Sequence, residues 1–322
     1  MNKLEDIGFY TLSDHRAEQS SDKSPLWRCE LVLTDACNFK CPYCRGVRKE
    51  ISGTMPFETA MSTVRLWCKQ GLKNVRFSGG EPTLYNGLEH LVAYCRERRV
   101  ARIAISTNGS ADFEVYQNLA KIGVNDFSIS LDACCSSVGD KMAGGICGAF
   151  SKTVENIKRI SKISYTTVGI VINEENLDQC VDTVMFADSL GVSDIRIIPS
   201  AQFNRLLDKL KEIPKSIVNK YPILKYRVEN SINGRNVRGI KAEDSHKCWL
   251  ALDDMAVAGG FHFPCIIYMR EQGNPIGGIS ENIRKERADF VGYHDTHLDP
   301  ICQKSCLDVC VAFNNKASQC RS

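Results

Sequence analysis

Short apolar segments and longer amphipathic segments alternate through the first two-thirds of the chain. The short segments are rich in β-branched residues and end at polar or turn-forming residues, as buried strands do. We predict strands at Cys29–Thr34, Asn74–Ser78, Arg102–Ser106, Asp126–Leu131, Tyr165–Ile172 and Asp194–Ile198. In the longer segments apolar residues recur with the period of a helix. We predict helices at Phe57–Gln70, Leu88–Arg99, Phe113–Ile122, Ala149–Ser161 and Asn176–Leu190.

This alternation predicts the fold class. Strands that alternate with helices form parallel β/α units, and right-handed crossovers would curl six such units into an open barrel. We therefore expect an α/β protein whose core is a partial (β/α)6 barrel. In barrels of this kind the functional groups lie at the carboxyl ends of the strands.

The rest of the chain has a looser pattern, which divides it into further segments. Residues 1–25 are a polar N-terminal extension, and residues 26–203 hold the expected barrel core. Residues 204–245 read as a charged linker or helical segment. Residues 246–322 are rich in cysteine, and we expect them to form a small C-terminal domain.

A hairpin signal lies inside the cysteine-rich segment. The apolar run at residues 248–252 reads as a first strand, and the run at residues 261–265 as a second. Gly259 and Gly260 lie between them, and a pair of glycines between two apolar runs favours a tight turn.

Composition and charge narrow the class of protein. The chain has 322 residues, of which 43% are hydrophobic and 25% charged, a balance typical of one or two globular domains. The net charge of +3 is too small to indicate a nucleic acid or an anionic membrane as partner. No apolar run approaches the ~18 residues of a membrane span, and the first residues lack the apolar core of a signal peptide. We therefore expect a cytoplasmic protein with no membrane or nucleic-acid partner.

The sixteen cysteines point to metal binding. Cys37, Cys41 and Cys44 lie on one short loop after the first strand, with the spacing C-x3-C-x2-C. Thiolates are the usual ligands of iron–sulfur clusters, and three of them would leave one iron of a cubane cluster open to a substrate or cofactor. A zinc site and buried free thiols are the alternatives, but no fourth cysteine or histidine lies nearby in the sequence.

Other strand ends also carry glycine or polar motifs. Strands two to five are followed or ended by Ser78-Gly79-Gly80-Glu81-Pro82, Ser106-Thr107-Asn108-Gly109, Ser130-Leu131-Asp132 and Asn173. Because the carboxyl ends of parallel strands meet at one rim, we expect these motifs to lie beside the cysteine loop.

Together these motifs resemble the signature of the radical S-adenosylmethionine (SAM) superfamily. The cysteine run is similar to the family's C-x3-C-x-aromatic-C, with Tyr43 in the aromatic position. Residues 79–82 resemble its GGEP motif and residues 107–109 its TNG motif. Residues 130–150 resemble the molybdenum-cofactor enzyme MoaA and its relatives. The resemblance covers roughly residues 27–200.

The resemblance implies a role for each motif. In this family the three cysteines hold a [4Fe–4S] cluster, and the amine and carboxylate of SAM chelate its open iron. Gly79 and Gly80 would let the amino group approach the backbone closely, and Glu81 would supply a counter-charge near it or near a basic neighbour. Tyr43 would lie against the adenine. Hydrogen bonds to the ribose and the carboxylate would come from Thr107, Asn108, Ser130 and Asn173.

A second group of cysteines, in the C-terminal segment, consists of Cys248, Cys265, Cys302, Cys306, Cys310 and Cys320. Cys248 followed by Gly260-x4-Cys265 resembles the auxiliary-cluster extensions called SPASM and twitch domains. The full SPASM pattern has a C-x2-C-x5-C-x3-C block, whereas this chain has C-x3-C-x3-C, which leaves too few matched ligands for two clusters. The resemblance implies one auxiliary [4Fe–4S] cluster, with four ligands drawn from the first five cysteines. A zinc site and a stripe of thiols along one helix are the alternatives.

The resemblance also implies a reaction: reductive cleavage of SAM to a 5′-deoxyadenosyl radical, which removes hydrogen from the substrate. Flavodoxin or ferredoxin would supply the electron, and the auxiliary cluster would accept an electron from the substrate radical or anchor the substrate. We expect a small polar metabolite, such as a nucleotide or an amino sugar, because the stretch before the first strand is too short for a peptide-recognition domain.

Other functions remain as alternatives. A maturase that modifies a ribosomal peptide is the second enzyme hypothesis. Molybdopterin synthesis is disfavoured because residues 319–322 lack that family's C-terminal Gly-Gly tail. An iron–sulfur electron carrier or redox sensor and a zinc-stapled binding module are the alternatives without SAM chemistry. The GGEP and TNG motifs disfavour a carrier, which needs no SAM pocket.

Overall fold

The computed structural model describes residues 16–205 and 207–321. Within these ranges one sheet has the strand order β6-β5-β4-β3-β2-β1-β7-β8-β9. Its first six strands all pair in parallel, which confirms the predicted β/α barrel core. The strands are β1 (Arg28–Val32), β2 (Asn74–Ser78), β3 (Arg102–Thr107), β4 (Asp126–Ser130), β5 (Tyr165–Ile172), β6 (Asp194–Pro199), β7 (Asp254–Ala258), β8 (Phe261–Phe263) and β9 (Gly277–Gly278).

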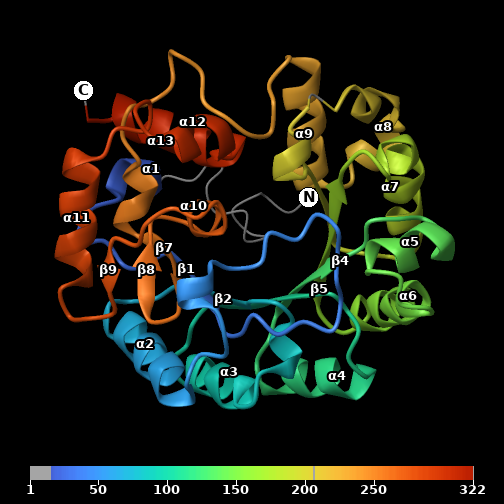
Figure 1. Cartoon of the computed structure of the whole chain (residues 1–322), viewed down its shortest axis with the longest axis horizontal. Helices are drawn as coiled ribbons and strands as arrows, with labels where there is room; N and C mark the ends of the chain where they lie inside the picture. Colours follow the sequence, from blue (N-terminus) through green and yellow to red (C-terminus); the bar gives the residue numbers. More distant parts are fainter. Residues whose placement is uncertain (1–15, 206, 322) are drawn as a thin grey trace.

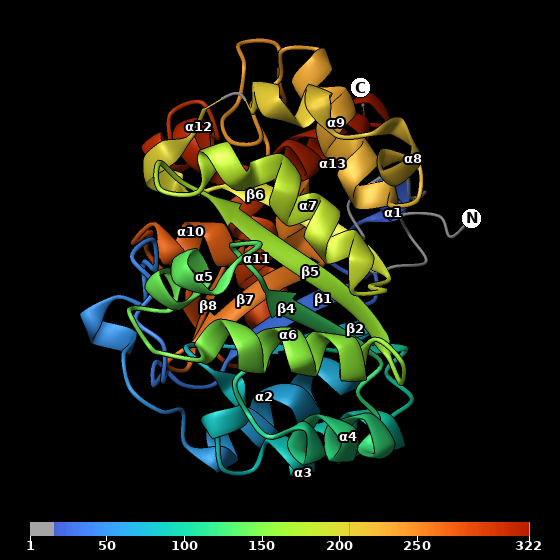
Figure 2. The same ribbon diagram turned by 90° about the vertical axis from the view of Figure 1, so that its right-hand side faces the viewer.

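Helices surround the curved sheet, as Figure 1 and Figure 2 show. Those between the barrel strands are α2 (Phe57–Lys69), α3 (Leu88–Glu97), α4 (Phe113–Ile122), α5 (Ser136–Met142), α6 (Ala149–Ile160) and α7 (Cys180–Ser189). The remaining helices are α1 (Arg16–Gln19), α8 (Lys215–Val218), α9 (Pro222–Ile232), α10 (Ile266–Arg270), α11 (Ile283–Tyr293), α12 (Pro300–Ser305) and α13 (Asp308–Gln319). No helix in the described ranges is both long and apolar enough to span a membrane.

The alternation of side chains along each strand separates the core from the barrel interior. On β2, Val75 and Phe77 are fully buried in the main hydrophobic core, together with Val64 and Trp67 of α2. Ser78 points to the other face, where its hydroxyl donates to Glu30 of β1. Successive strand residues point to opposite faces, so the barrel strands send apolar side chains to the helices and leave polar ones for the interior.

The segment at residues 204–245 belongs to the same core. Helix α9 packs beside β6, the edge strand of the barrel (Figure 2), and Leu224 and Val228 of α9 are buried in the main hydrophobic core. Some of the charged residues that suggested a linker lie on the outside, as Lys225 and Glu229 do in an exposed ion pair, whereas Arg227 and Arg238 are buried.

The predicted hairpin is present, but its first strand begins later than predicted. Gly259 and Gly260, both with positive φ, connect β7 to β8. The apolar run before β7 instead forms a 3-10 helix, η7 (Trp249–Leu252). Contacts with α13 hold it there, since the backbone NH of Leu250 donates to Asn314 at 3.0 Å.

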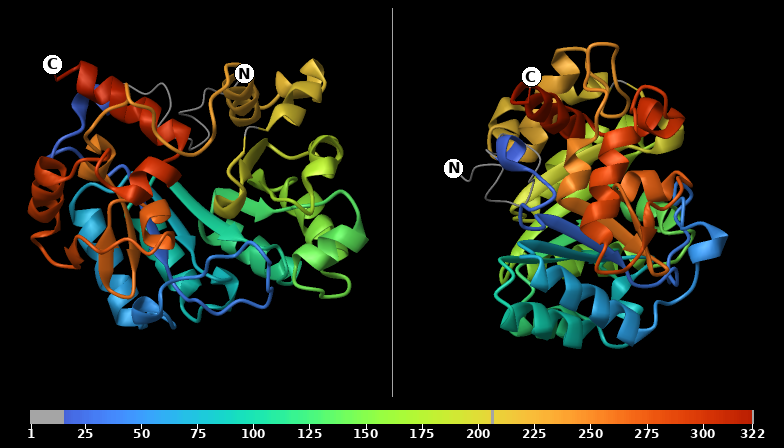
Figure 3. Two further views of the ribbon diagram at one scale, coloured as in Figure 1. Left: turned by 45° about the horizontal axis from the view of Figure 1, so that its top comes forward. Right: turned by 90° about the vertical axis from the view of Figure 1, so that its left-hand side faces the viewer.

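The cysteine-rich segment continues the barrel sheet. Strand β7 pairs in parallel with β1, and the hairpin adds β8 and β9 beyond it. Arg287 of α11, fully buried, donates to the carbonyl oxygens of Ala251 and Phe263 and so attaches α11 to η7 and β8. Figure 3 shows the helices of this segment beside the open side of the barrel.

Candidate functional site

A cavity of about 370 Å³ opens at the carboxyl ends of the barrel strands, which is within the range of small-molecule sites. It is lined by most of the predicted site residues, namely Cys37, Cys41, Cys44, Tyr43, Gly79, Gly80, Thr107, Asn108 and Ser130. Two of the residues predicted to contact SAM do not line it. Asn173 lines a smaller neighbouring hollow together with Tyr43, and Glu81 is fully buried.

The three cysteines of the loop after β1 all line the cavity. Cys37 and Cys44 are exposed and Cys41 is partly buried. Burial, the negative charge of Asp132 and the neighbouring thiols of Cys44 and Cys37 together raise the pKa of Cys41 to about 12. Burial also raises the pKa of Cys37. The thiols of Cys37 and Cys41 therefore hold their protons at neutral pH until a metal ion replaces those protons.

The spacing of the thiols suits a cluster better than a single zinc ion. Among the described residues, only His294, Asp299 and Cys302 form a group of three ligand side chains whose ligand atoms all lie within 4.8 Å of one another. The sulfurs of the cysteine loop are thus farther apart than three thiolates that each lie roughly 2.3 Å from one zinc ion. A cluster of several irons accommodates wider spacing, so the donor set fits an iron–sulfur cluster.

Positions 79 and 80 must be glycine, because the backbone just before the cysteine loop leaves no room for a side chain. A β-carbon on Gly79 would lie 2.3 Å from the carbonyl oxygen of Thr34, and one on Gly80 would lie 2.3 Å from that of Ala36. The NH groups of Gly80 and Glu81 donate to these same two oxygens at 2.7 and 2.8 Å. Because these two residues have no side chains, the turn after β2 can approach the start of the cysteine loop closely enough to form both hydrogen bonds.

Glu81 joins two strand ends beneath the cavity. Its carboxylate accepts hydrogen bonds from the hydroxyl and NH of Thr83, the hydroxyl of Thr107 and the NH of Asn108. Burial raises the pKa of Glu81, whereas these hydrogen bonds lower it. No basic side chain in the described ranges pairs with it, so it holds the GGEP turn against the end of β3.

The polar side chains predicted to bind the ribose and the carboxylate of SAM differ in whether they already form hydrogen bonds within the protein. The Thr107 hydroxyl is engaged by Glu81. The Asn108 amide donates to Asn38 at 2.9 Å and lies 3.7 Å from the sulfur of Cys37. Ser130 is exposed at the cavity.

Asp132 is a site residue that the sequence prediction did not select. It lines the cavity, and the Tyr43 hydroxyl donates to its carboxylate. The same carboxylate accepts the NH of Val171 at 2.7 Å. Burial raises the pKa of Asp132 to about 6. Its position at the end of the fourth strand motif was the signal that could have identified it.

Three arginines were also missed. Arg45, Arg238 and Arg270 line the cavity from the cysteine loop, the segment after α9 and the end of α10. Arg45 directly follows Cys44 in the sequence, but no local pattern distinguishes the other two.

Five cysteines of the C-terminal segment lie together; we call Cys248, Cys265, Cys302, Cys306 and Cys310 the auxiliary cysteines. Burial raises the pKa of Cys306, and the other four thiols raise it further because they lie close to it. Cys320 is exposed at the end of α13.

Cys302, Cys306 and Cys310 do not lie along one helix, as the thiol-stripe alternative required. Cys302 lies on α12 and Cys310 on α13. Cys306 lies between the two helices with a ψ of 131°, so the chain turns at this point. Because of this turn, three thiols of one short segment lie close to one another. On one continuous helix they would be spread along its length.

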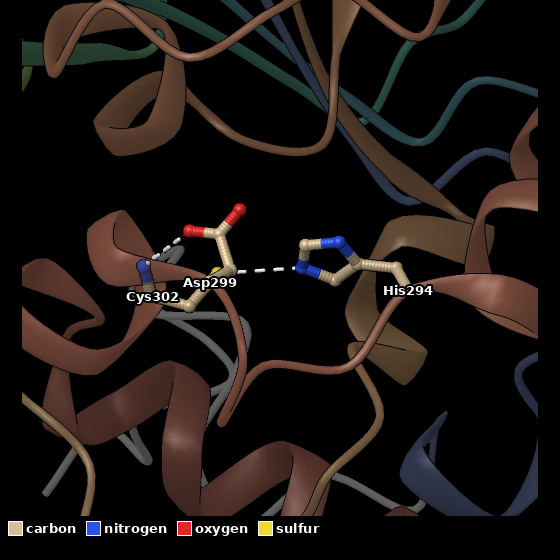
Figure 4. Close-up of side chains that lie close together, drawn as sticks. All are labelled: His294, Asp299 and Cys302. Atoms are coloured by element: carbon tan, nitrogen blue, oxygen red, sulfur yellow. Dashed lines mark hydrogen bonds between the residues drawn. The ribbon is translucent and has the colours of Figure 1, made fainter.

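Figure 4 shows His294, Asp299 and Cys302 side by side. The Nε2 atom of His294 lies 3.6 Å from the sulfur of Cys302. Asp299, however, accepts the NH groups of Ile301 and Cys302 as the N-cap of α12, and its other oxygen accepts the hydroxyl of Tyr268. Helix capping therefore accounts for the position of Asp299 without a metal ion.

Known proteins are similar to this chain in the sequence of the barrel. Residues 31–187 match the model of the radical SAM superfamily. The GTP 3′,8-cyclase of Petrotoga mobilis is 26% identical over 286 residues, which cover 79% of this chain and 86% of that protein. The probable GTP 3′,8-cyclase of Saccharolobus solfataricus is 27% identical over 177 residues, which cover 54% of this chain and only 57% of that protein.

Solved structures share the fold. The structure of anSMEcpe with bound AdoMet has a TM-score of 0.61 at 15% identity, and the match covers 92% of this chain and 91% of that one. SuiB of Streptococcus suis has a TM-score of 0.61 at 16% identity, with 87% of this chain and 67% of SuiB covered. The matched sequence model, the cysteine loop and the shared fold agree: through residues 31–187, this chain belongs to the radical SAM superfamily of enzymes.

Proposed function

We propose that this protein holds a [4Fe–4S] cluster on Cys37, Cys41 and Cys44, binds SAM in the adjoining cavity, and acts on a small polar metabolite. The observation that carries the proposal is the position of three thiols at the edge of a cavity whose walls are the glycine and polar strand ends. When bound, the cluster and SAM supply one-electron cleavage of SAM and a radical that removes hydrogen from the substrate. A flavodoxin or ferredoxin is the proposed source of the electron.

The chain's own residues position these groups and shield them. Gly79 and Gly80 fix the cysteine loop, and the Tyr43–Asp132 hydrogen bond attaches it to the end of β4. Phe39 lines the cavity as an apolar wall, which reduces the water near a reactive intermediate. SAM contacts by Asn108 and Ser130 are part of the proposal, because both reach the cavity.

The test is production of 5′-deoxyadenosine. Anaerobically reconstituted protein, given dithionite and SAM, should form 5′-deoxyadenosine and methionine. The same protein with an intact cluster and no 5′-deoxyadenosine would contradict SAM chemistry and favour an electron carrier.

We further propose one auxiliary [4Fe–4S] cluster bound by four of the auxiliary cysteines. Its support is the convergence of five buried or partly buried thiols from three separate segments. Iron analysis should give about eight irons per chain, and about four after substitution of both Cys248 and Cys265 by alanine. About four irons in the unchanged protein would remove the auxiliary cluster.

The substrate class has a second candidate. The matched SuiB structure is described as bound to the precursor peptide SuiA, and this likeness in fold keeps a peptide substrate as the alternative. The metabolite proposal is supported by the cyclase relatives named for GTP. Deuterium transfer into 5′-deoxyadenosine from a labelled metabolite or a labelled peptide distinguishes the two.

A further inference from the structure

Three guanidinium groups meet at one side of the cavity. They come from segments far apart in the sequence: Arg45 from the cysteine loop, Arg238 from the segment after α9 and Arg270 from the end of α10. All three line the same cavity, where the positive charges of Arg238 and Arg270 act on Arg45. Repulsion between these positive charges destabilises the folded protein, and a bound anion would reduce that repulsion.

The side chain of Arg238 carries a buried hydrogen-bond donor, Nη1, that has no acceptor among the described residues. The side chain is 4% exposed, and its Nε donates to the carbonyl oxygen of Pro199 at 3.2 Å. Its Nη1 is buried and makes no hydrogen bond with any described residue. No carboxylate among the described residues forms an ion pair with it. A buried guanidinium in this condition is costly unless a further group binds it.

Arg270 is held in place by backbone alone. Its Nη1 donates to the carbonyl oxygen of Gly46 at 2.6 Å and its Nη2 to that of Gly79 at 3.0 Å. Both oxygens are neutral, so the full charge of Arg270 remains at the cavity. Arg45 is the one member of the three with a counter-charge in the described ranges, since it forms an ion pair with Glu271.

The carboxylates that also line the cavity are engaged elsewhere. Glu30 accepts the Ser78 hydroxyl and lies near the buried Arg196. Asp35 accepts the NH of Gly53 at 2.8 Å, and Asp132 accepts the Tyr43 hydroxyl. None of these three carboxylates forms an ion pair with Arg238 or Arg270, so within the described ranges only Arg45, through Glu271, has a direct counter-charge. A phosphate monoester carries about −1.5 to −2 at neutral pH, whereas a carboxylate carries one negative charge.

We propose that Arg45, Arg238 and Arg270 bind a phosphate group of the substrate, so that the enzyme acts on a phosphorylated metabolite. This inference rests on the proposed function for the identity of the cavity as the substrate site. Arg238 pairs with Leu307 through a β-bridge, and the NH of Gly239 donates to the carbonyl of Cys306. The phosphate end of the substrate therefore lies on the side of the auxiliary cysteines.

The test uses inorganic pyrophosphate as the probe and succinate as its carboxylate counterpart. Binding to the anaerobically reconstituted protein is measured by calorimetry for the unchanged chain and for R45Q, R238Q and R238K. Arg98→Gln is the matched control, because Arg98 is exposed at the end of α3 and does not line the cavity. We expect R45Q and R238Q each to weaken pyrophosphate binding about tenfold or more. R238K should weaken it less, and R98Q should leave it unchanged.

Several results would overturn the inference. Equal pyrophosphate affinity in the unchanged chain and in correctly folded R238Q and R238K would do so. Succinate binding as tight as pyrophosphate would assign the arginines to carboxylates, as in an acidic peptide. A larger loss of SAM affinity than of pyrophosphate affinity would assign them to the SAM carboxylate.

The two proposals fail in different ways. If the unchanged protein binds pyrophosphate through these arginines but forms no 5′-deoxyadenosine, the proposed function is wrong and the phosphate site stands. If it forms 5′-deoxyadenosine but does not bind pyrophosphate, only the phosphate site is wrong.

Discussion

Two side chains beneath and beside the cavity illustrate how single residues hold the site. Glu81 accepts four hydrogen bonds at full burial, and Asp132 accepts the Tyr43 hydroxyl and a backbone NH. Both carboxylates accept hydrogen bonds from backbone and side-chain groups that form the walls of the site. Their hydrogen-bond partners, more than their charges, therefore determine what a substitution does.

Glu81→Gln should destabilise the protein. The amide nitrogen of glutamine would face the NH of Asn108, so a buried donor would lose its acceptor at a cost of about 1–3 kcal/mol. We expect a lower midpoint in chemical denaturation and a raised KM for SAM. Glu155→Gln, on the exposed face of α6, is the control and should change neither. An E81Q protein as stable as the unchanged one would show that these hydrogen bonds contribute little.

Cys41→Ala should remove the cluster of the cysteine loop. Since a cubane needs at least three protein thiolates at this site, we expect about four fewer irons per chain and no 5′-deoxyadenosine. Cys147→Ser is the matched control, because Cys147 is exposed and does not line the cavity. Full iron content in C41A would mean that another group serves as the third ligand.

At the scale of elements, the turn after β2 and the cysteine loop behave as one unit. The NH groups of Gly80 and Glu81 donate to Thr34 and Ala36, which continues the β1–β2 pairing into the loop. The position of the three cysteines therefore depends on a turn that contains none of them.

Gly80→Ala should disturb the cluster from a distance. The added β-carbon would lie 2.3 Å from the oxygen of Ala36, so the loop must move, at a cost of about 1–3 kcal/mol. We expect reduced iron incorporation at the cysteine loop and a lower melting temperature. Gly292→Ala is the control: the space around Gly292 is open and it lies in α11, where alanine favours the helix. Normal iron content in G80A would refute the coupling.

The sequence predicted some elements well and others poorly, for physical reasons. The six barrel strands have dense apolar runs, and the glycine pair between β7 and β8 favours a turn locally, so both were predictable. The run at Trp249–Leu252 looked like a strand, but contacts with α13 make it a 3-10 helix. Likewise, the turn at Cys306 cannot be read from the spacing of Cys302 and Cys310, which also fits a helix.

At the scale of the whole molecule, the cysteine-rich segment and the barrel share one sheet through the pairing of β7 with β1. The cysteine loop was predictable because its three thiols are neighbours in sequence. The group of Arg45, Arg238 and Arg270 was not, because three distant segments bring it together. Sequence motifs thus identified the side of the cavity that carries the cysteine loop and the glycine turn, and the fold was needed for the other side.

Stability should fall as pH rises, because of buried carboxyl groups. Burial raises the pKa of Asp194, at the start of β6, to about 7. The folded protein then holds this proton more tightly than the unfolded chain, so the benefit is greatest at low pH and is lost as pH rises from about 4 to about 7. Asp194→Asn should raise the free energy of unfolding at pH 8 by on the order of 1–3 kcal/mol.

Denaturation curves at several pH values check this expectation. The gain from Asp194→Asn should shrink below about pH 4, where the aspartic acid becomes neutral in both states. Asp182→Asn, at an exposed position of α7, serves as the control and should show no such trend. A pH-independent difference between D194N and the unchanged chain would contradict the raised pKa.

The most direct test of the central claim is electron paramagnetic resonance of the reduced, reconstituted protein before and after addition of SAM. If SAM binds at the open iron of a cluster on Cys37, Cys41 and Cys44, its addition should change the spectrum of that cluster. Cys41→Ala should lack the SAM-sensitive signal while any signal of the auxiliary cluster persists. A spectrum that SAM leaves unchanged, from protein with full iron content, would contradict the claim that this site binds SAM.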